Sequence, residues 1–185
     1  WLFGFLRMGT TGFAAQAYGR DDTLEVVALL VRGLLIGLAC GFFVILIHPI
    51  LFWLSFFISP SSNEVEMLAL DYMSIRIFSA PAIISTYAIT GWLIALEKTK
   101  YVLILQLAMN GLNAALDFWF VFGFGWGVEG VAWATFIAEW FAFFMGLAIC
   151  FAVSRKFPKI IWPLIFSKTK IIAILVVNRD IFLRS

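Results

Sequence analysis

An apolar run between residues 110 and 140 carries four polar side chains in the interior of its two predicted helices. They are Asn113, Asp117, Thr135 and Glu139. Asn113 and Asp117 are four residues apart, and so are Thr135 and Glu139, so each pair shares one face of an α-helix. Carboxylate, amide and hydroxyl oxygens are the ligands that hard cations prefer. The pattern therefore indicates a site that binds a cation such as Na⁺ or takes up a proton.

The carboxyl group of Asp117 is the strongest part of this signal. A carboxylate in the middle of a membrane is disfavoured by about 2.5 to 3.5 kcal/mol on insertion scales. Because residues 110–140 contain no Lys or Arg, Asp117 needs a proton, a cation or a distant Arg. The alternative is that Asn113, Asp117 and Thr135 only tie two helices together. An amide or hydroxyl would do that without the cost of ionisation, so the presence of a carboxyl group favours a cation site. Glu139 is a further candidate, either as part of the cavity around this site or as a proton relay.

Two antiparallel helices are needed to bring these residues together. A hairpin that turns at Trp126 has residues 117 and 135 at equal distances from the turn, and likewise 113 and 139. With a rise of about 1.5 Å per residue, the level of Asp117 lies roughly 8 Å inside the outer helix end and that of residue 113 roughly 14 Å. We therefore expect each couple at matched depth, with all four side chains facing one chamber.

The composition places these helices in a membrane. The chain is 63% hydrophobic and 13% charged, whereas soluble domains have roughly 45–50% apolar and about 25% charged residues. Its net charge is +2 and no basic run is interleaved with polar residues, so no nucleic-acid partner is indicated. Cys40 and Cys150 lie in apolar runs without a CxxC pair, so neither a disulfide framework nor a metal site is indicated.

The fold class is therefore an all-α polytopic membrane protein. A membrane-crossing helix needs about 20 mainly apolar residues, which divides residues 1–153 into one partial and four full spans. The expected spans are 1–18, 26–58, 66–96, 101–122 and 128–153. Asp22 is expected to cap the second. Residues 154–185 are expected to be a linker and the start of the next membrane helix.

Lys and Arg are distributed unequally between the loops. Loops 59–64 and 123–130 contain neither residue, and the basic residues of the other loops are Arg20, Lys98, Lys100, Arg155, Lys156 and Lys159. Because Lys and Arg are enriched in cytoplasmic loops, the loops near 20, 98 and 155–170 are predicted to be cytoplasmic.

Two further patterns concern helix packing. Gly33, Gly37 and Gly41 recur every four residues and predict a stripe where another helix approaches closely. Tryptophans recur every seven residues, which suits interface anchoring, helix packing or the lining of a substrate cavity; they are Trp119, Trp126, Trp133 and Trp140. Arg76, inside the third span, is expected to have a structural partner, such as Asp71 or a residue of a helix outside this chain, and this role is favoured over contact with the substrate.

Five blocks in order resemble the MATE (multidrug and toxic compound extrusion) family, in its DinF-like branch. They are FLRMGTTGFAAQAYG at 5–19, YMSIRIFSAPA at 72–82, NGLNAALDFWFVFG at 110–123, GVEGVAWATFIAEW at 127–140 and NRDIFLRS at 178–185. The resemblance implies a twelve-helix transporter of two six-helix lobes. The chain, which starts without Met inside an apolar segment, is interpreted as a fragment holding helices two to six and the start of seven. It would lack the first helix and the carboxy-terminal lobe.

The resemblance also implies a mechanism. Asp117, Asn113 and Thr135 would form the cation site of the amino-terminal lobe, completed by an Asp of the first helix. H⁺ or Na⁺ entering the cell would drive export of small amphiphilic drugs or metabolites across the bacterial inner membrane by alternating access. No cofactor other than the coupling ion is implied, and membrane lipid is the surrounding partner.

Two alternatives stay open. A lipid-linked oligosaccharide flippase shares the broader fold, but its cavity should carry several basic residues for pyrophosphate. An intramembrane hydrolase could use Asp117 and Glu139 as a carboxylate pair, yet the sequence has no HExxH, GxSxG or Gly-rich phosphate loop. The favoured interpretation is a secondary active transporter rather than an enzyme.

Overall fold

Helices make up the regular structure throughout the described part of the chain, which contains no β-strand. The computed structural model describes residues 3–157, 162–167, 170, 172 and 176. The α-helices are α1 (Gly4–Gly19), α2 (Thr23–Ile58), α3 (Asn63–Arg76), α4 (Ala80–Ala95), α5 (Thr99–Phe118), α6 (Gly127–Ser154) and α7 (Trp162–Ile165). A 3₁₀ turn, Ile77–Ser79, joins α3 to α4, and a π turn, Trp119–Gly123, follows α5.

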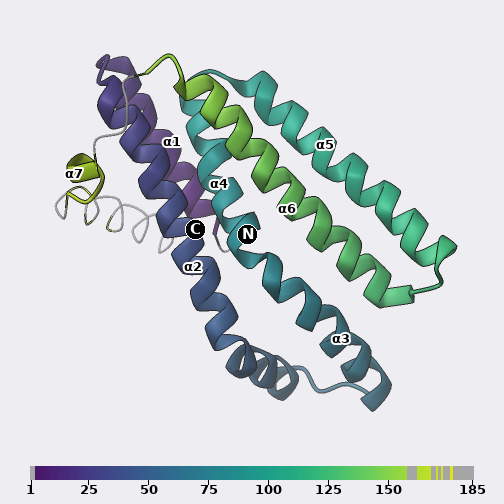
Figure 1. The fold of residues 1–185 in the computed structure, drawn as a ribbon. Helices are drawn as coiled ribbons and strands as arrows, with labels where there is room; N and C mark the ends of the chain where they lie inside the picture. The colour runs from purple at the N-terminus through teal and green to yellow at the C-terminus, as the bar shows by residue number, and fades with distance from the viewer. Residues whose placement is uncertain (1–2, 158–161, 168–169, 171, 173–175, 177–185) are drawn as a thin grey trace.

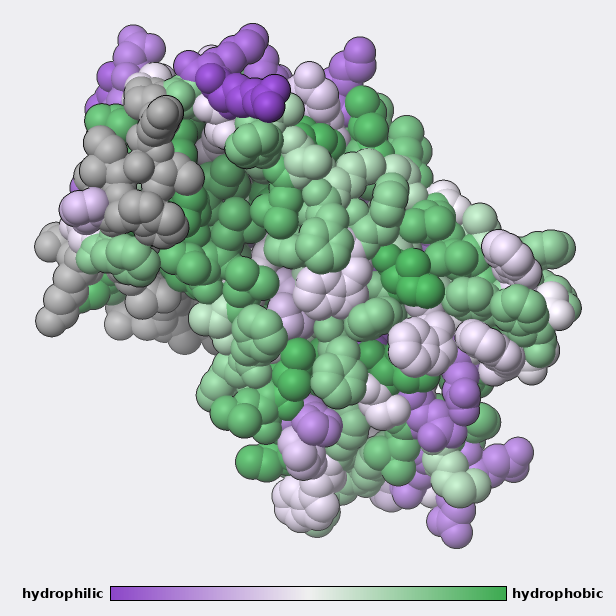
Figure 2. Space-filling view, viewed as in Figure 1, coloured by the Kyte–Doolittle hydropathy of each residue, from purple (hydrophilic) through white to green (hydrophobic). Residues whose placement is uncertain are grey.

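Long helices run side by side and form one bundle (Figure 1). By length and composition, four helical stretches in the described residues could cross a membrane: Thr23–Ile58, Asn63–Ala95, Thr99–Gly123 and Gly127–Ser154. Figure 2 shows the result on one face of the molecule, where apolar side chains form a broad belt and hydrophilic ones gather toward opposite ends. The predicted all-α membrane fold is confirmed.

The glycine stripe of α2 is where α4 packs most closely. A Cβ atom added to Gly33 would lie 3.0 Å from Ala88 Cβ, and one added to Gly37 would lie 2.8 Å from Ser85 Cα. At Gly41 it would lie 2.2 Å from Pro81 Cα, a distance that no real Cβ contact shows. The backbones of α2 and α4 therefore approach because α2 has no side chains along this line. The predicted packing role of the stripe is confirmed.

Two short turns at one end of the bundle have the same design. Asp21 and Glu97 have positive φ angles of 56° and 59° directly after α1 and α4. The amide that follows each reaches back to close the helix: Asp22 N donates to Ala17 O at 3.0 Å and Lys98 N to Leu93 O at 2.8 Å. Asp22 Oδ1 then accepts from the amide of Glu25 at 3.1 Å, which confirms the predicted cap of the second helix.

The third span, predicted over 66–96, is one helical stretch over Asn63–Ala95, but it is not α-helical throughout. It tightens into the 3₁₀ turn Ile77–Ser79 before α4 begins. Pro81 has no N–H to donate to the carbonyl of Ile77, and its ring would clash with that carbonyl in a regular helix. The chain tightens instead, and Ser79 Oγ donates to Arg76 O at 2.8 Å. The 3₁₀ turn leaves Arg76 as the last residue of α3.

Of the predicted linker, the structure describes residues 154–157, 162–167 and three single positions after them, so the expected start of a further membrane helix lies outside the described ranges. Arg32, in α2 and 1% exposed, holds α7 in place: its Nε donates to Ile165 O at 3.0 Å. The same guanidinium pairs with Glu25, Nη1 to Oε1 at 2.7 Å, and Lys170 Nζ reaches Glu25 Oε2 at 2.5 Å. This end of the bundle is thus tied to the segment after α6 by charged side chains.

Candidate functional site

Asn113 and Thr135 meet between α5 and α6. Asn113 Nδ2 donates to Thr135 Oγ1 at 3.2 Å, and the same hydroxyl donates to Val131 O at 2.9 Å. Both side chains are half-buried. The hydroxyl thus donates within its own helix and accepts from the neighbouring one. The structure confirms that the hairpin brings these two predicted residues into contact.

The register of the hairpin differs from the prediction. Thr135 was expected opposite Asp117, with a hairpin centred on residue 126, but it bonds Asn113, and the midpoint of that pair is residue 124. The cause lies in the connection: α5 continues into the five-residue π turn Trp119–Gly123, and the chain reverses at 124–126 before α6 begins at Gly127. A π turn holds more residues than an α turn. Residues at equal distances from Trp126 in the sequence therefore do not lie opposite one another in α5 and α6.

Asp117 lies one turn after Asn113 on α5. Its side chain is half-buried, and its Oδ1 atom is shielded from solvent without a hydrogen-bond partner among the residues that the structure describes. A buried polar atom without a partner is unfavourable by a few kcal/mol, and more if it is charged. Such an oxygen is where a proton or a cation would be stabilising.

Glu139 does not join the Asn113–Thr135 contact. Both of its carboxylate oxygens accept from Arg76: Nη1 lies 2.5 Å from Oε2 and Nη2 lies 2.9 Å from Oε1. Arg76 Nη1 also donates to Ser79 Oγ at 3.0 Å. The expectation that all four polar side chains face one chamber is therefore wrong for Glu139, and Arg76 is paired with Glu139 rather than with Asp71. The signal available in the sequence was the opposite charge of two residues inside different spans.

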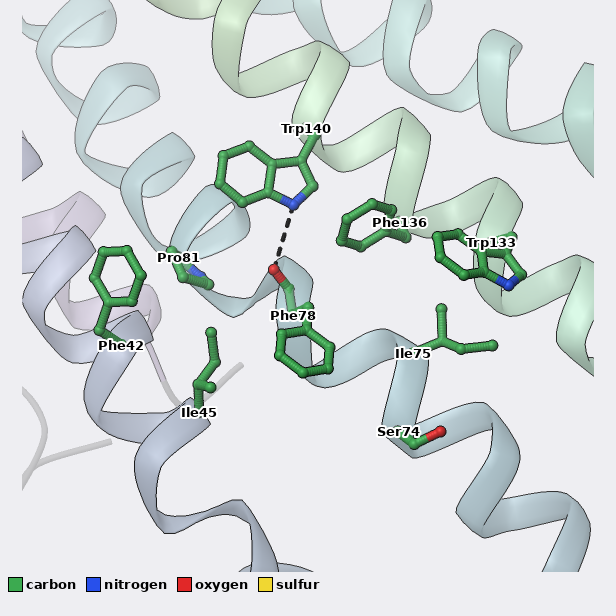
Figure 3. A pocket seen from close by; sticks show the side chains of 9 residues that line it. All are labelled: Phe42, Ile45, Ser74, Ile75, Phe78, Pro81, Trp133, Phe136 and Trp140. Atoms are coloured by element: carbon green, nitrogen blue, oxygen red, sulfur yellow. Dashed lines mark hydrogen bonds between the residues drawn. The ribbon is translucent and has the colours of Figure 1, made fainter.

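An aromatic cavity of about 440 Å³ lies between α2, the turn that joins α3 to α4, and α6 (Figure 3). Ser74 is its one hydroxyl-bearing lining residue, and Trp140 Nε1 donates to Phe78 O at 3.3 Å at its edge. The lining residues are Phe42, Ile45, Ser74, Ile75, Phe78, Pro81, Trp133, Phe136 and Trp140. Pockets of about 300–1,000 Å³ suit small organic ligands. Two of the four heptad-spaced tryptophans thus line a cavity.

Comparison with known proteins gives consistent matches. A sequence model of the MatE family matches residues 1–119. DNA damage-inducible protein F of Escherichia coli (strain K12) is 35% identical over 100% of this chain and 40% of its own length. The probable multidrug resistance protein NorM of Bacillus cereus is 28% identical over 75% of this chain and 31% of its own length.

Solved structures share the arrangement of helices. One described as the outward-facing conformation of a multidrug resistance MATE family transporter of the MOP superfamily superposes with a TM-score of 0.86 at 24% identity, over 98% of this chain and 41% of that one. The inward-facing conformation of such a transporter gives 0.82 at 23% identity, over 96% and 40%. The chain thus spans less than half the length of the relatives and structures that it matches.

Proposed function

This chain belongs to the MatE family, and from that premise we propose that it is part of a cation-coupled antiporter that exports small amphiphilic drugs or metabolites. The described helices form part of one lobe of a larger transporter fold, to which the rest of the polypeptide would add the first helix and the second lobe. H⁺ or Na⁺ entering the cell would occupy the site on α5 and α6. The lobe would then repack and release the substrate outward by alternating access.

The observation that carries the proposal is the buried, unbonded Oδ1 atom of Asp117. The neighbouring turn of α5 supplies the Asn113 amide, which is held by Thr135 of α6. Neutralising the carboxyl with a cation removes the cost of an isolated charge in the membrane, so occupancy of the site changes the stability of the lobe. A membrane potential adds about 2.3 kcal/mol per unit charge per 100 mV, which helps to drive such exchange.

The aromatic cavity supports an amphiphilic substrate over a lipid-linked pyrophosphate. No Lys or Arg is among its described lining residues, whereas a pyrophosphate group needs several basic partners. Arg76 lines a different pocket, and both of its terminal nitrogens donate to Glu139. An apolar, aromatic lining favours flat or hydrophobic groups. Relatives in Escherichia coli and Bacillus cereus support a location in a bacterial inner membrane.

The test is Asp117→Asn in the intact polypeptide, reconstituted in proteoliposomes. Export driven by a proton or Na⁺ gradient should be abolished while the protein remains inserted and folded, because Asn cannot exchange a charge. Asp71→Asn is the matched control, since Asp71 is an exposed acid on α3 and should retain gradient-driven export. Undiminished export by Asp117→Asn would refute the assignment of the site, and binding of lipid-linked pyrophosphate without any response to drugs would favour a flippase.

A further inference from the structure

The Arg76–Glu139 pair joins two elements far apart in the chain. Arg76 ends α3 at the 3₁₀ turn in the third span, and Glu139 lies on α6, one turn after Thr135. The contact is two-pronged, with each terminal nitrogen on its own carboxylate oxygen. Such fork geometry fixes orientation as well as distance. The side chain of Glu139 is 8% exposed and that of Arg76 is 25% exposed, so the ion pair is largely buried.

We propose that Arg76 is a positioning residue for the proposed cation site: it holds the Glu139 carboxylate away from the site, so that Asp117 is the acidic residue of the hairpin interior that exchanges the cation. The inference rests on the proposed function. It assigns a role to a residue that does not itself touch the cation.

The geometry supports this in two ways. Thr135 and Glu139 are four residues apart and share one face of α6, so a Glu139 released from Arg76 would be a second acid within one turn of the Asn113–Thr135 contact. The pair also anchors α6 against α3 one turn away from Thr135, which bonds Asn113. Ser79, which is buried, accepts from Arg76 and thereby fixes the guanidinium from the α4 side of the 3₁₀ turn.

Loss of Arg76 therefore has a consequence that a purely structural ion pair would not have. In Arg76→Gln the Glu139 carboxylate is left buried without its cation, a state that persists only with a proton or a metal cation in its place. Glu139 then becomes an alternative acceptor on the same helix face as Thr135. Cation binding by Glu139 can be measured separately in a protein that lacks the Asp117 carboxyl group.

The experiment compares variants of the intact polypeptide in detergent, with bound ²²Na⁺ and proton uptake from weakly buffered solution as probes. Asp117→Asn should lose most of the cation binding that the unmodified protein shows. Adding Arg76→Gln to Asp117→Asn should raise cation binding several-fold above that background. Adding Glu139→Gln as a third change should abolish the gain. A folded double variant with no gain would overturn the positioning role.

A charge-swap variant separates the role of the ion pair from a failure to fold. Arg76→Glu with Glu139→Arg can reform the pair in reverse and should keep the number of cations bound by the unmodified protein, with Asp117 as the acceptor. A folded swap variant that binds an additional cation, or none, would also overturn the proposal. Retention of full cation binding by Asp117→Asn alone would instead refute the proposed function, which separates the two failures.

Discussion

Thr135 has one hydroxyl with two hydrogen bonds that run to different helices. It donates to Val131 O in α6 and accepts from Asn113 Nδ2 in α5. Thr135→Val keeps the shape of the side chain but removes its hydroxyl oxygen, so the Asn113 amide loses the acceptor of its hydrogen bond. We expect a loss of about 1 kcal/mol in stability and, because the hydroxyl oxygen is a proposed ligand, weaker cation binding. Thermal unfolding and ²²Na⁺ or proton binding by the intact polypeptide measure the two effects.

Thr86→Val is the matched control for this change. Thr86 is buried in α4, and its hydroxyl donates to Ala82 O at 2.8 Å within its own helix. The substitution removes the same type of intrahelical bond from a helix outside the α5–α6 hairpin, so cation binding should be unchanged. Equal losses of cation binding in both variants would show that Thr135 acts only through general stability.

The sequence predicted that α5 and α6 form a hairpin with polar side chains between them, but it predicted the wrong partners within the hairpin and missed the contact between distant spans. The spacing placed Thr135 opposite Asp117 and Asn113 opposite Glu139, whereas the structure pairs Asn113 with Thr135. The spacing could not show that Glu139 faces Arg76, 63 residues away. Residue spacing fixes the face that a side chain occupies on its own helix, but the neighbour that covers this face depends on the packing of α3 against α6.

Helix packing depends on the glycine stripe of α2. Gly41→Ala would place a methyl group 2.2 Å from Pro81 Cα. Helices α2 and α4 would have to move apart to accommodate it. Overpacking of this kind costs about 1–3 kcal/mol. We expect a lower apparent Tm of the detergent-solubilised protein, measured by size-exclusion chromatography after heating.

Gly12→Ala serves as the comparison for the helix-packing prediction. A Cβ atom at Gly12 in α1 would meet nothing within 4 Å among the described residues. Replacing a helical Gly by Ala reduces the entropy lost on folding and is worth roughly 0.5–1 kcal/mol. Gly12→Ala should therefore leave the apparent Tm unchanged or raise it. A Gly41→Ala protein as stable as Gly12→Ala would contradict the close approach of α2 and α4.

The elements themselves were largely predictable because their signals are local. Apolar runs of sufficient length predicted helices that correspond to α2, α5 and α6, and Asp22 correctly predicted a cap. The irregular helical turns within these apolar runs were not predicted. The 3₁₀ turn before Pro81 and the π turn after Phe118 change the hydrogen-bonding pattern without changing hydropathy, so a search for apolar length does not find them. Both irregular turns affect the site, one by placing Arg76 and the other by shifting the register of the hairpin.

The bundle as a whole has two ends of different charge character. The turns at Arg20 and Lys98 lie at one end, whereas the lysine-free connections 59–62 and 124–126 lie at the other (Figure 1). The apolar belt between the ends (Figure 2) fits a membrane, and the enrichment of Lys and Arg in cytoplasmic loops predicts which end faces the cytoplasm.

Cysteine labelling of the intact polypeptide in its membrane tests this orientation. Cys40 and Cys150 are first replaced by Ala, and a single cysteine is introduced as Ser61→Cys or Thr99→Cys, both at exposed positions in opposite ends of the bundle. A membrane-impermeant maleimide should label Ser61→Cys in intact spheroplasts and Thr99→Cys only in inside-out vesicles. The reverse pattern would place Lys98 and Lys100 outside, against the charge rule, and would require the cation on Asp117 to be exchanged from the opposite side of the membrane.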